Sequence, residues 1–87
     1  MDLGDWRARI DAVDEQLVDL FNKRMEYVLE IGKLKRARGQ AVRDEEREKA
    51  ILERLIAYNK GPMSSAAIAE IFARIMQEAR DLEEEQK

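Results

Sequence analysis

The chain of 87 residues contains no cysteine and no histidine, and it has little glycine or proline. Without cysteine, a disulfide cannot stabilise so small a domain, and thiol nucleophiles are excluded. Without histidine there is no imidazole base and no Ser-His triad, and a zinc site would need carboxylates alone. Any catalysis must therefore rest on Arg, Lys, Asp, Glu and backbone groups, and we expect no metal.

Long hydrophobic runs and an excess of positive charge are also missing. No apolar run approaches the roughly 20 residues of a membrane-spanning helix, and the acidic start MDLGD has no signal-peptide pattern. With 16 Lys and Arg against 19 Asp and Glu, the formal net charge is -3, which provides no basic face for nucleic acid. The sequence therefore predicts a cytoplasmic protein that binds neither membranes nor nucleic acid.

What the sequence has is the composition of long amphipathic helices, with 40% charged and 45% hydrophobic residues. Apolar residues recur at spacings of three and four in three segments. The predicted helices cover residues 5–38, residues 44–58, and a third stretch from Ser64 or Ser65 to Glu84. Gly4 or Asp5 is the expected start of the first helix, and Asp44 is the expected N-cap of the second.

The first predicted helix is about twice as long as the second, roughly 50 Å at about 1.5 Å per residue. In a single chain, part of its apolar face would therefore have no cover, and a domain of this size already has a poor surface-to-volume ratio. That face consists of Trp6, Ile10, Val13, Leu17, Leu20, Phe21, Val28 and Ile31. We predict an all-α fold of three helices, one long and two shorter, in a single domain (1–87) that forms an intertwined homodimer.

Charged residues interrupt the apolar faces of all three predicted helices. Arg24 and Lys35 fall on the buried side of the first helix, and Arg7 lies beside Trp6 near its start. The other inward charges are Asp44, Arg47 and Glu48 on the second helix and Glu83 on the third. A buried charge is costly unless it is paired. If Asp44 caps its helix, cations exceed acids, and a small dianion held by arginine would complete the balance.

Each of these charges also has an ordinary explanation. A long Lys or Arg side chain often lies along an apolar face with its head group in water. N-capping explains Asp44 fully, and Glu83 could belong to an acidic tail, residues 83–87, that frays into solvent. The set on three helices is harder to explain in this way than any one member.

Three stretches together are similar to the all-helical class of chorismate mutases over nearly the whole chain. They are WRARIDAVDEQLVDLFNKRMEYVLEIGKLK, AVRDEEREKAILERL and IAEIFARIMQEARDLEE. Within them, the patterns R-x-x-I-D-x-[VL]-D, R-x-x-x-x-x-x-I-G-K-x-K and V-R-D-x-x-R-E are specific in combination. The last stretch resembles mutase domains fused to prephenate dehydratase.

The resemblance implies a domain-swapped dimer that converts chorismate, a small dianion, to prephenate without a cofactor, in aromatic amino-acid biosynthesis on the shikimate pathway. It implies that Arg7 reaches into the site of the other subunit, that Arg24 holds a substrate carboxylate, and that Lys35 contacts a carboxylate and the breaking ether oxygen. The remaining implied site residues are Asp44, Arg47 and Glu48 near the ring hydroxyl, with Glu48 accepting its hydrogen bond, and Ile31 lining the pocket.

Two positions depart from the best-known bacterial pattern of the family. Ala79 stands where a serine often contacts a carboxylate, so that contact is lost or replaced. Glu83 stands where a glutamine often donates to the ether oxygen, and a glutamate must be protonated to donate. We therefore include both Ala79 and Glu83 among the expected site residues.

Two alternatives stay open from the sequence. An enzyme of the same fold that removes pyruvate from isochorismate would use the same carboxylate clamps. A non-catalytic helical dimerisation module would instead use the inward charges to set register, and Arg24 and Lys35 would then pair with acids and leave no pocket.

Overall fold

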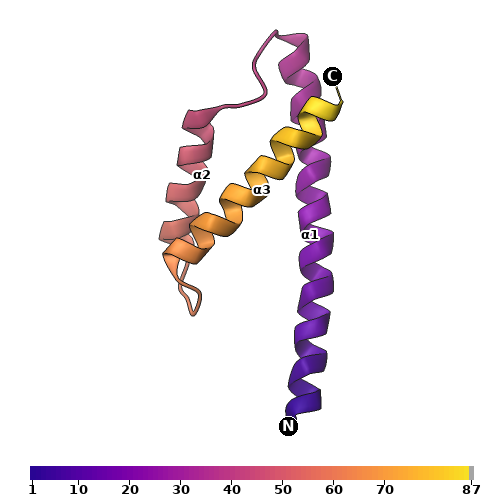
Figure 1. Cartoon of the computed structure of the whole chain (residues 1–87), viewed down its shortest axis with the longest axis vertical. Helices are drawn as coiled ribbons and strands as arrows, with labels where there is room; N and C mark the ends of the chain where they lie inside the picture. The colour runs from indigo at the N-terminus through magenta and orange to yellow at the C-terminus, as the bar shows by residue number, and fades with distance from the viewer. Residues whose placement is uncertain (87) are drawn as a thin grey trace.

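The computed structural model describes residues 1–86, so Lys87, the last residue of the predicted domain, lies outside the described residues. The chain forms α1 (Leu3–Ala37), α2 (Glu45–Tyr58) and α3 (Ser65–Glu85). The predicted all-α fold of three helices with a long first helix is confirmed (Figure 1). Among residues 1–86, no helix has the combination of length and hydropathy that a membrane crossing requires.

Helix α1 begins earlier than the sequence prediction placed it. The carboxylate of Asp2 accepts a hydrogen bond from the Asp5 amide at 2.9 Å, and the Asp5 carboxylate accepts one from the Asp2 amide at 3.1 Å. This reciprocal capping box satisfies two amides at the helix start, which makes Asp2 the N-cap, and the prediction of Gly4 or Asp5 as the start was wrong. After α1, Gly39 adopts a φ of 68°, a conformation that terminates helices.

Each of the two shorter helices begins with an N-cap residue whose side chain accepts a backbone hydrogen bond. Asp44 accepts a hydrogen bond from the Arg47 amide at 3.0 Å, so the predicted cap of α2 is confirmed. Of the two candidate serines for α3, Ser64 is the cap, and its hydroxyl accepts from the Ala67 amide at 3.1 Å. Helix α3 continues to Glu85 and buries Glu83, which is only 5% exposed, so the prediction that Glu83 frays into solvent was wrong.

Helix α3 joins the other two helices into one structure. It packs against both α1 and α2, whereas within residues 1–86 α1 and α2 do not pack on each other. In Figure 1, α3 runs diagonally from the end of α2 to the C-terminal half of α1. The buried apolar side chains come from all three helices: Val28, Ile51, Ile75, Met76 and Ala79. The core therefore lies along α3, and it is small.

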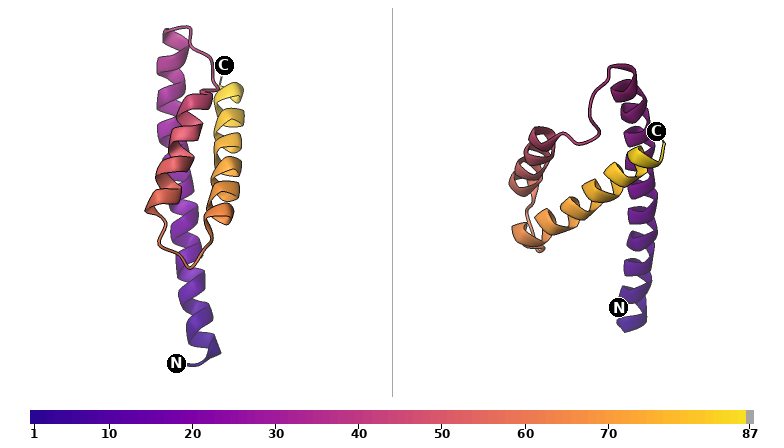
Figure 2. Two further views of the ribbon diagram at one scale, coloured as in Figure 1. Left: turned by 90° about the vertical axis from the view of Figure 1, so that its left-hand side faces the viewer. Right: turned by 45° about the horizontal axis from the view of Figure 1, so that its top comes forward.

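The N-terminal half of α1 extends beyond the other helices, as both views in Figure 2 show. Its apolar side chains are uncovered, with Trp6 53%, Ile10 59% and Val13 51% exposed. The radius of gyration is 16.0 Å, against about 12 Å for a compact chain of this length. The accessible surface is 6995 Å², against about 5300 Å² for a compact monomer of this mass. The single chain thus leaves bare the apolar face for which the sequence predicted a second copy.

Candidate active site

A cavity of about 370 Å³ lies where α3 crosses between the C-terminal half of α1 and the start of α2. Its volume falls within the range of small-molecule sites, roughly 300–1,000 Å³. The predicted site residues that line it are Arg24, Ile31, Lys35, Asp44, Arg47, Glu48, Ala79 and Glu83. Arg7 is the exception, because it precedes Arg24 on α1 by a helix length of roughly 25 Å.

Arg24 lines this cavity and has one unpaired nitrogen. Its Nη1 atom is buried and has no hydrogen-bond partner among the described residues. Burial lowers the pKa of the Arg24 guanidinium, and the positive charges of Arg47 and Arg54 lower it further. A buried donor without an acceptor is costly and uncommon in folded proteins. The arrangement therefore favours an anionic ligand that accepts a hydrogen bond from Arg24.

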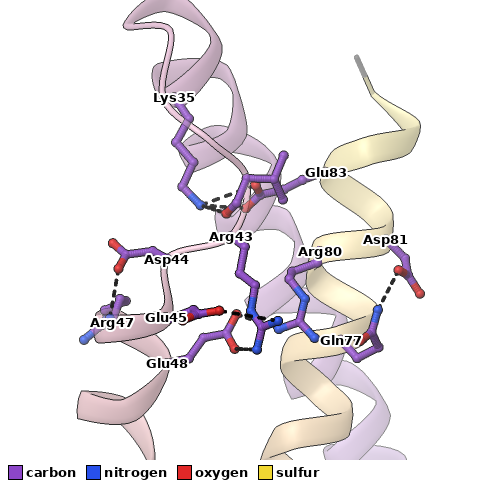
Figure 3. A network of polar contacts seen from close by, with 11 residues as sticks. Lys35, Arg43, Asp44, Glu45, Arg47, Glu48, Gln77, Arg80, Asp81 and Glu83 are labelled. Carbon is purple, nitrogen blue, oxygen red and sulfur yellow. Dashed lines mark hydrogen bonds and ion pairs between the residues drawn. The ribbon is translucent and has the colours of Figure 1, made fainter.

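Lys35 connects α1, the loop before α2, and α3. Its Nζ atom donates to the carbonyl oxygen of Val42 at 2.6 Å and lies 3.4 Å from both carboxylate oxygens of Glu83 (Figure 3). Helix α3 comes close to α1 here, because a Cβ atom at Gly32 would lie in van der Waals contact with Glu83 Cγ at 3.4 Å. An ammonium group and a carboxyl group are thus fixed side by side on one wall of the cavity.

Glu48 also lines the cavity and lies between two arginines. Arg80 on α3 donates from Nη1 to Glu48 Oε2 at 2.5 Å, and Arg43 lies 3.7 Å from Oε1 (Figure 3). The Arg80 and Glu48 side chains are both 19% exposed, whereas that of Arg43 is 56% exposed. The Arg80 contact is therefore the short and sheltered one, and it joins α3 to α2.

The charges around the cavity leave an excess of unpaired cations. The lining cations are Arg24, Lys35, Arg47 and Arg80, and the lining acids are Asp44, Glu48 and Glu83. Asp44 caps α2, while Glu48 pairs with Arg80 and Glu83 pairs with Lys35. Within residues 1–86, the Arg24 and Arg47 side chains have no acid partner, and two guanidinium groups match a dianion. The same described residues contain no cluster of acids that could hold a metal ion.

The profile of the family described as Chorismate mutase type II matches residues 6–84. The chain belongs to this chorismate mutase family. A bifunctional chorismate mutase/prephenate dehydratase from Neisseria gonorrhoeae is 36% identical over 77 residues, which cover 88% of this chain and 21% of that protein. The chain therefore spans about a fifth of the length of the curated relatives it matches.

Solved chorismate mutases share the fold of this chain. The structure of chorismate mutase (form II) from Thermus thermophilus has a TM-score of 0.94 at 33% identity and covers 98% of this chain and 97% of its own. A crystal structure of chorismate mutase from Helicobacter pylori in complex with prephenate has a TM-score of 0.88 at 29% identity and covers 95% of this chain and 90% of its own. The resemblance to all-helical chorismate mutases is thus confirmed.

Sequence reasoning missed several residues that line this cavity. The charged one is Arg80, and the apolar ones are Tyr27, Val28, Val42, Ile51 and Met76. Arg80 precedes Glu83 by three residues on α3, a spacing that places both side chains on one face. That spacing was the available signal. The pairing of Arg80 with Glu48, which lies 32 residues away in the sequence, depends on how α3 packs on α2.

Proposed function

We propose that this chain catalyses the rearrangement of chorismate to prephenate in the cavity between its three helices. It acts as an intertwined, domain-swapped homodimer in the cytoplasm, and the reaction serves aromatic amino-acid biosynthesis. The observation that supports this most directly is the pair of unpartnered guanidinium groups, Arg24 and Arg47, at a cavity of about 370 Å³. Membership of the family supplies the reaction, and the charges explain how a dicarboxylate substrate is bound.

The arginines contribute mainly orientation. The rearrangement is unimolecular and pericyclic, so it needs no nucleophile and no general base, in keeping with a chain that lacks Cys and His. The flexible substrate must be held with its enolpyruvyl arm folded over the ring. Arg24, with its buried free Nη1, binds one carboxylate, and Arg7 of a second copy binds the other. Holding the reactive conformer in this way removes much of the entropic barrier.

Lys35 and Glu83 contribute electrostatic stabilisation. Negative charge grows on the ether oxygen as the carbon–oxygen bond breaks, and fixed donors aimed at that oxygen lower the barrier. Lys35 donates from a position held by the Val42 carbonyl, and Glu83 donates in its protonated form. Glu48 accepts a hydrogen bond from the ring hydroxyl, and Asp44 and Arg47, in the same part of the chain at the start of α2, also line the cavity.

The remaining predicted residues shape the apolar part of the cavity. Ala79 is buried on α3, and Ile31 lies on α1 with 48% of its surface exposed in the single chain. Both offer hydrocarbon surface to the substrate ring, and neither can donate a hydrogen bond from its side chain. The carboxylate contact that Ala79 cannot make falls to the arginines.

The homodimer rests on the bare face of α1. Trp6, Ile10 and Val13 are each more than half exposed, and a second long helix would cover them. Because Arg7 shares that part of α1, pairing two long helices carries Arg7 away from its own cavity and toward that of the other copy. One arrangement therefore accounts for both the uncovered surface and the distance of Arg7 from Arg24.

The unpaired Arg24 opposes the alternative of a non-catalytic dimerisation module. That alternative required Arg24 and Lys35 to pair with acids and to leave no pocket. Lys35 does pair with Glu83, but Arg24 stays unpaired beside an open cavity among the described residues. The alternative of an isochorismate lyase would use the same arginines to bind the carboxylates. Only an assay with each of the two substrates can therefore distinguish it from a chorismate mutase.

The test is incubation of the purified protein with chorismate, and separately with isochorismate. We expect the ultraviolet absorbance of chorismate to disappear with formation of prephenate, and isochorismate to release no pyruvate. Arg24→Ala, purified identically, is the control for contaminating mutase and should lose at least about 100-fold in kcat/KM. A helical, monodisperse wild-type protein that leaves chorismate unchanged would refute the proposal.

A further inference from the structure

Arg80 is held more firmly than any other cation around the cavity. Its Nη1 donates to Glu48 at 2.5 Å, and its Nη2 donates to the side-chain oxygen of Gln77 at 2.6 Å, one turn earlier on α3. Two nitrogens of one planar group are thus fixed by two different residues, as Figure 3 shows. Because Gln77 orients the guanidinium, Arg80 presents a rigid donor to Glu48.

Glu48 has other cations within the same cavity. Arg24 and Arg47 line it and have no acid partner among residues 1–86, and the Nη1 atom of Arg24 is buried without a hydrogen-bond partner. Opposite charges attract strongly where water is scarce. A glutamate with free side-chain torsions would therefore turn toward these guanidinium groups. It would then occupy the donors that bind the substrate carboxylates.

The contacts of Glu48 prevent this turn. Arg80 engages Oε2 from α3, and Arg43 lies near Oε1 from the exposed side at 3.7 Å. Both contacts hold the carboxylate on the side of Arg43 and Arg80, and in Figure 3 it points away from Arg47. Of the two, only the Arg80 contact is short, and its atoms are sheltered to the same degree as Glu48 itself.

We propose that Arg80 is a positioning residue, which acts through Glu48 and keeps that carboxylate from forming ion pairs with the substrate-binding arginines Arg24 and Arg47. The inference rests on the proposed function, because it concerns the same cavity. It assigns Arg80 no contact with the substrate. Its consequence is that the cavity keeps two guanidinium groups available although an acid lies beside them.

The test is a double-mutant cycle with steady-state kinetics on chorismate. Arg80→Met keeps the length and the apolar stem of the side chain but removes the charge. We expect kcat/KM to fall by about 10- to 100-fold, mostly through KM, because Glu48 now competes with the substrate for Arg24. In a Glu48→Gln background, the neutral amide does not compete, so adding Arg80→Met should change KM by less than about threefold. Arg80→Lys should recover part of the loss.

The matched control is Arg74→Met on the same helix. Arg74 forms an ion pair with Glu78 at 2.8 Å, with side chains 77% and 50% exposed, outside the cavity. It should leave both kinetic constants unchanged. Thermal unfolding of every variant separates kinetic effects from loss of fold, since a merely structural Arg80 would lower the melting temperature without raising KM selectively.

The outcomes are distinct. If wild-type protein does not turn over chorismate, the proposed function fails and this inference fails with it. If wild-type protein is active but Arg80→Met raises KM equally with Glu48 or with Gln at position 48, the proposed function stands and the positioning role is overturned. Loss of the KM effect in the Glu48→Gln background supports the role.

Discussion

At the scale of single residues, Arg24 combines a structural cost with the substrate-binding role that we propose for it. Its Nη1 is buried without an acceptor among the described residues, and Arg47 and Arg54 add unfavourable positive charge. Replacing an unsatisfied buried charge with an apolar group of similar shape often stabilises a fold. We expect Arg24→Met to raise the free energy of unfolding by about 1 kcal/mol while abolishing most activity.

Chemical denaturation together with kcat/KM measures both effects in one preparation. Arg54→Met is the matched control, because Arg54 lies near Arg24 but does not line the cavity. The Arg54→Met variant should relieve some of the repulsion between Arg54 and Arg24 and should keep the activity of wild type. An Arg24→Met variant that is markedly less stable than wild type would show that Arg24 holds the fold rather than the substrate.

Glu83 is predicted to donate a hydrogen bond to the ether oxygen of the substrate. An ionised carboxylate only accepts hydrogen bonds, whereas an amide group donates. Glu83→Gln, whose amide supplies this donor, should therefore keep kcat on chorismate at or above the wild-type value, which steady-state kinetics measures.

The control is Glu78→Gln, because Glu78 is an acid on the same helix that lies outside the cavity and pairs with Arg74. This variant should leave kcat unchanged. A Glu83→Gln variant with a kcat far below that of wild type would mean that Glu83 is not the donor.

The sequence predicted individual charges better than it predicted their partners. Arg24, Lys35 and Glu83 stood out because each breaks an apolar pattern on its own helix, and local periodicity is enough to detect that. Arg80 did not stand out, since its importance lies in reaching Glu48 across two helices. Likewise, no property of Arg24 in the sequence shows that Nη1 lacks an acceptor. Such features depend on how the helices pack.

At the scale of the elements, side-chain caps fix where each helix starts. Ser64 accepts from the Ala67 amide at 3.1 Å and begins α3, the helix that carries Ala79, Arg80 and Glu83 to the cavity. Removing an N-cap acceptor typically costs about 1 kcal/mol. We expect Ser64→Ala to lower the free energy of unfolding by this amount and to leave kcat/KM nearly unchanged, because the cavity lies at the other end of α3.

Denaturant unfolding measures this effect, and Ser64→Asp is the matched control. Aspartate also accepts the amide hydrogen bond and places a negative charge at the helix N-terminus, so its stability should equal or exceed that of wild type. Equal stability of Ser64→Ala and wild type would indicate that the neighbouring Ser65 takes over the cap.

The sequence predicted the start of a helix correctly where only one residue was a plausible N-cap. Asp44 was the one plausible cap ahead of α2, and it is the cap. The start of α1 was misplaced because Asp2 and Asp5 act as a pair, and their reciprocal bonds outweigh a single candidate at either Gly4 or Asp5. The end of α3 was predicted to within one residue, but the interpretation of Glu83 as part of a fraying tail was wrong, because the acidic composition of the tail carries no information about Lys35, which pairs with Glu83.

At the scale of the whole molecule, the single chain is an incomplete unit. Its three helices bury only a small core along α3, and the half of α1 that carries Trp6 and Ile10 extends beyond the other two helices in Figure 1. Arg7 lies too far along α1 to reach the cavity of its own chain. In the proposed homodimer, a second copy would cover the bare half of α1 and bring its Arg7 to the cavity, so folding and activity should both depend on assembly.

Mixing two inactive variants tests this shared site. In a homodimer where each cavity combines its own Arg24 with Arg7 of the other copy, Arg7→Ala and Arg24→Ala each disable both cavities. A hybrid of the two has one cavity with both arginines intact and one with neither. After random exchange of subunits, about a quarter of wild-type activity should return. The control is each variant mixed with itself, which should stay inactive. The Arg7→Ala and Arg24→Ala proteins should both keep the helicity and the dimer mass of wild type. Mass spectrometry of intact dimers shows whether hybrids have formed, and hybrids without activity would mean that each copy completes its own site.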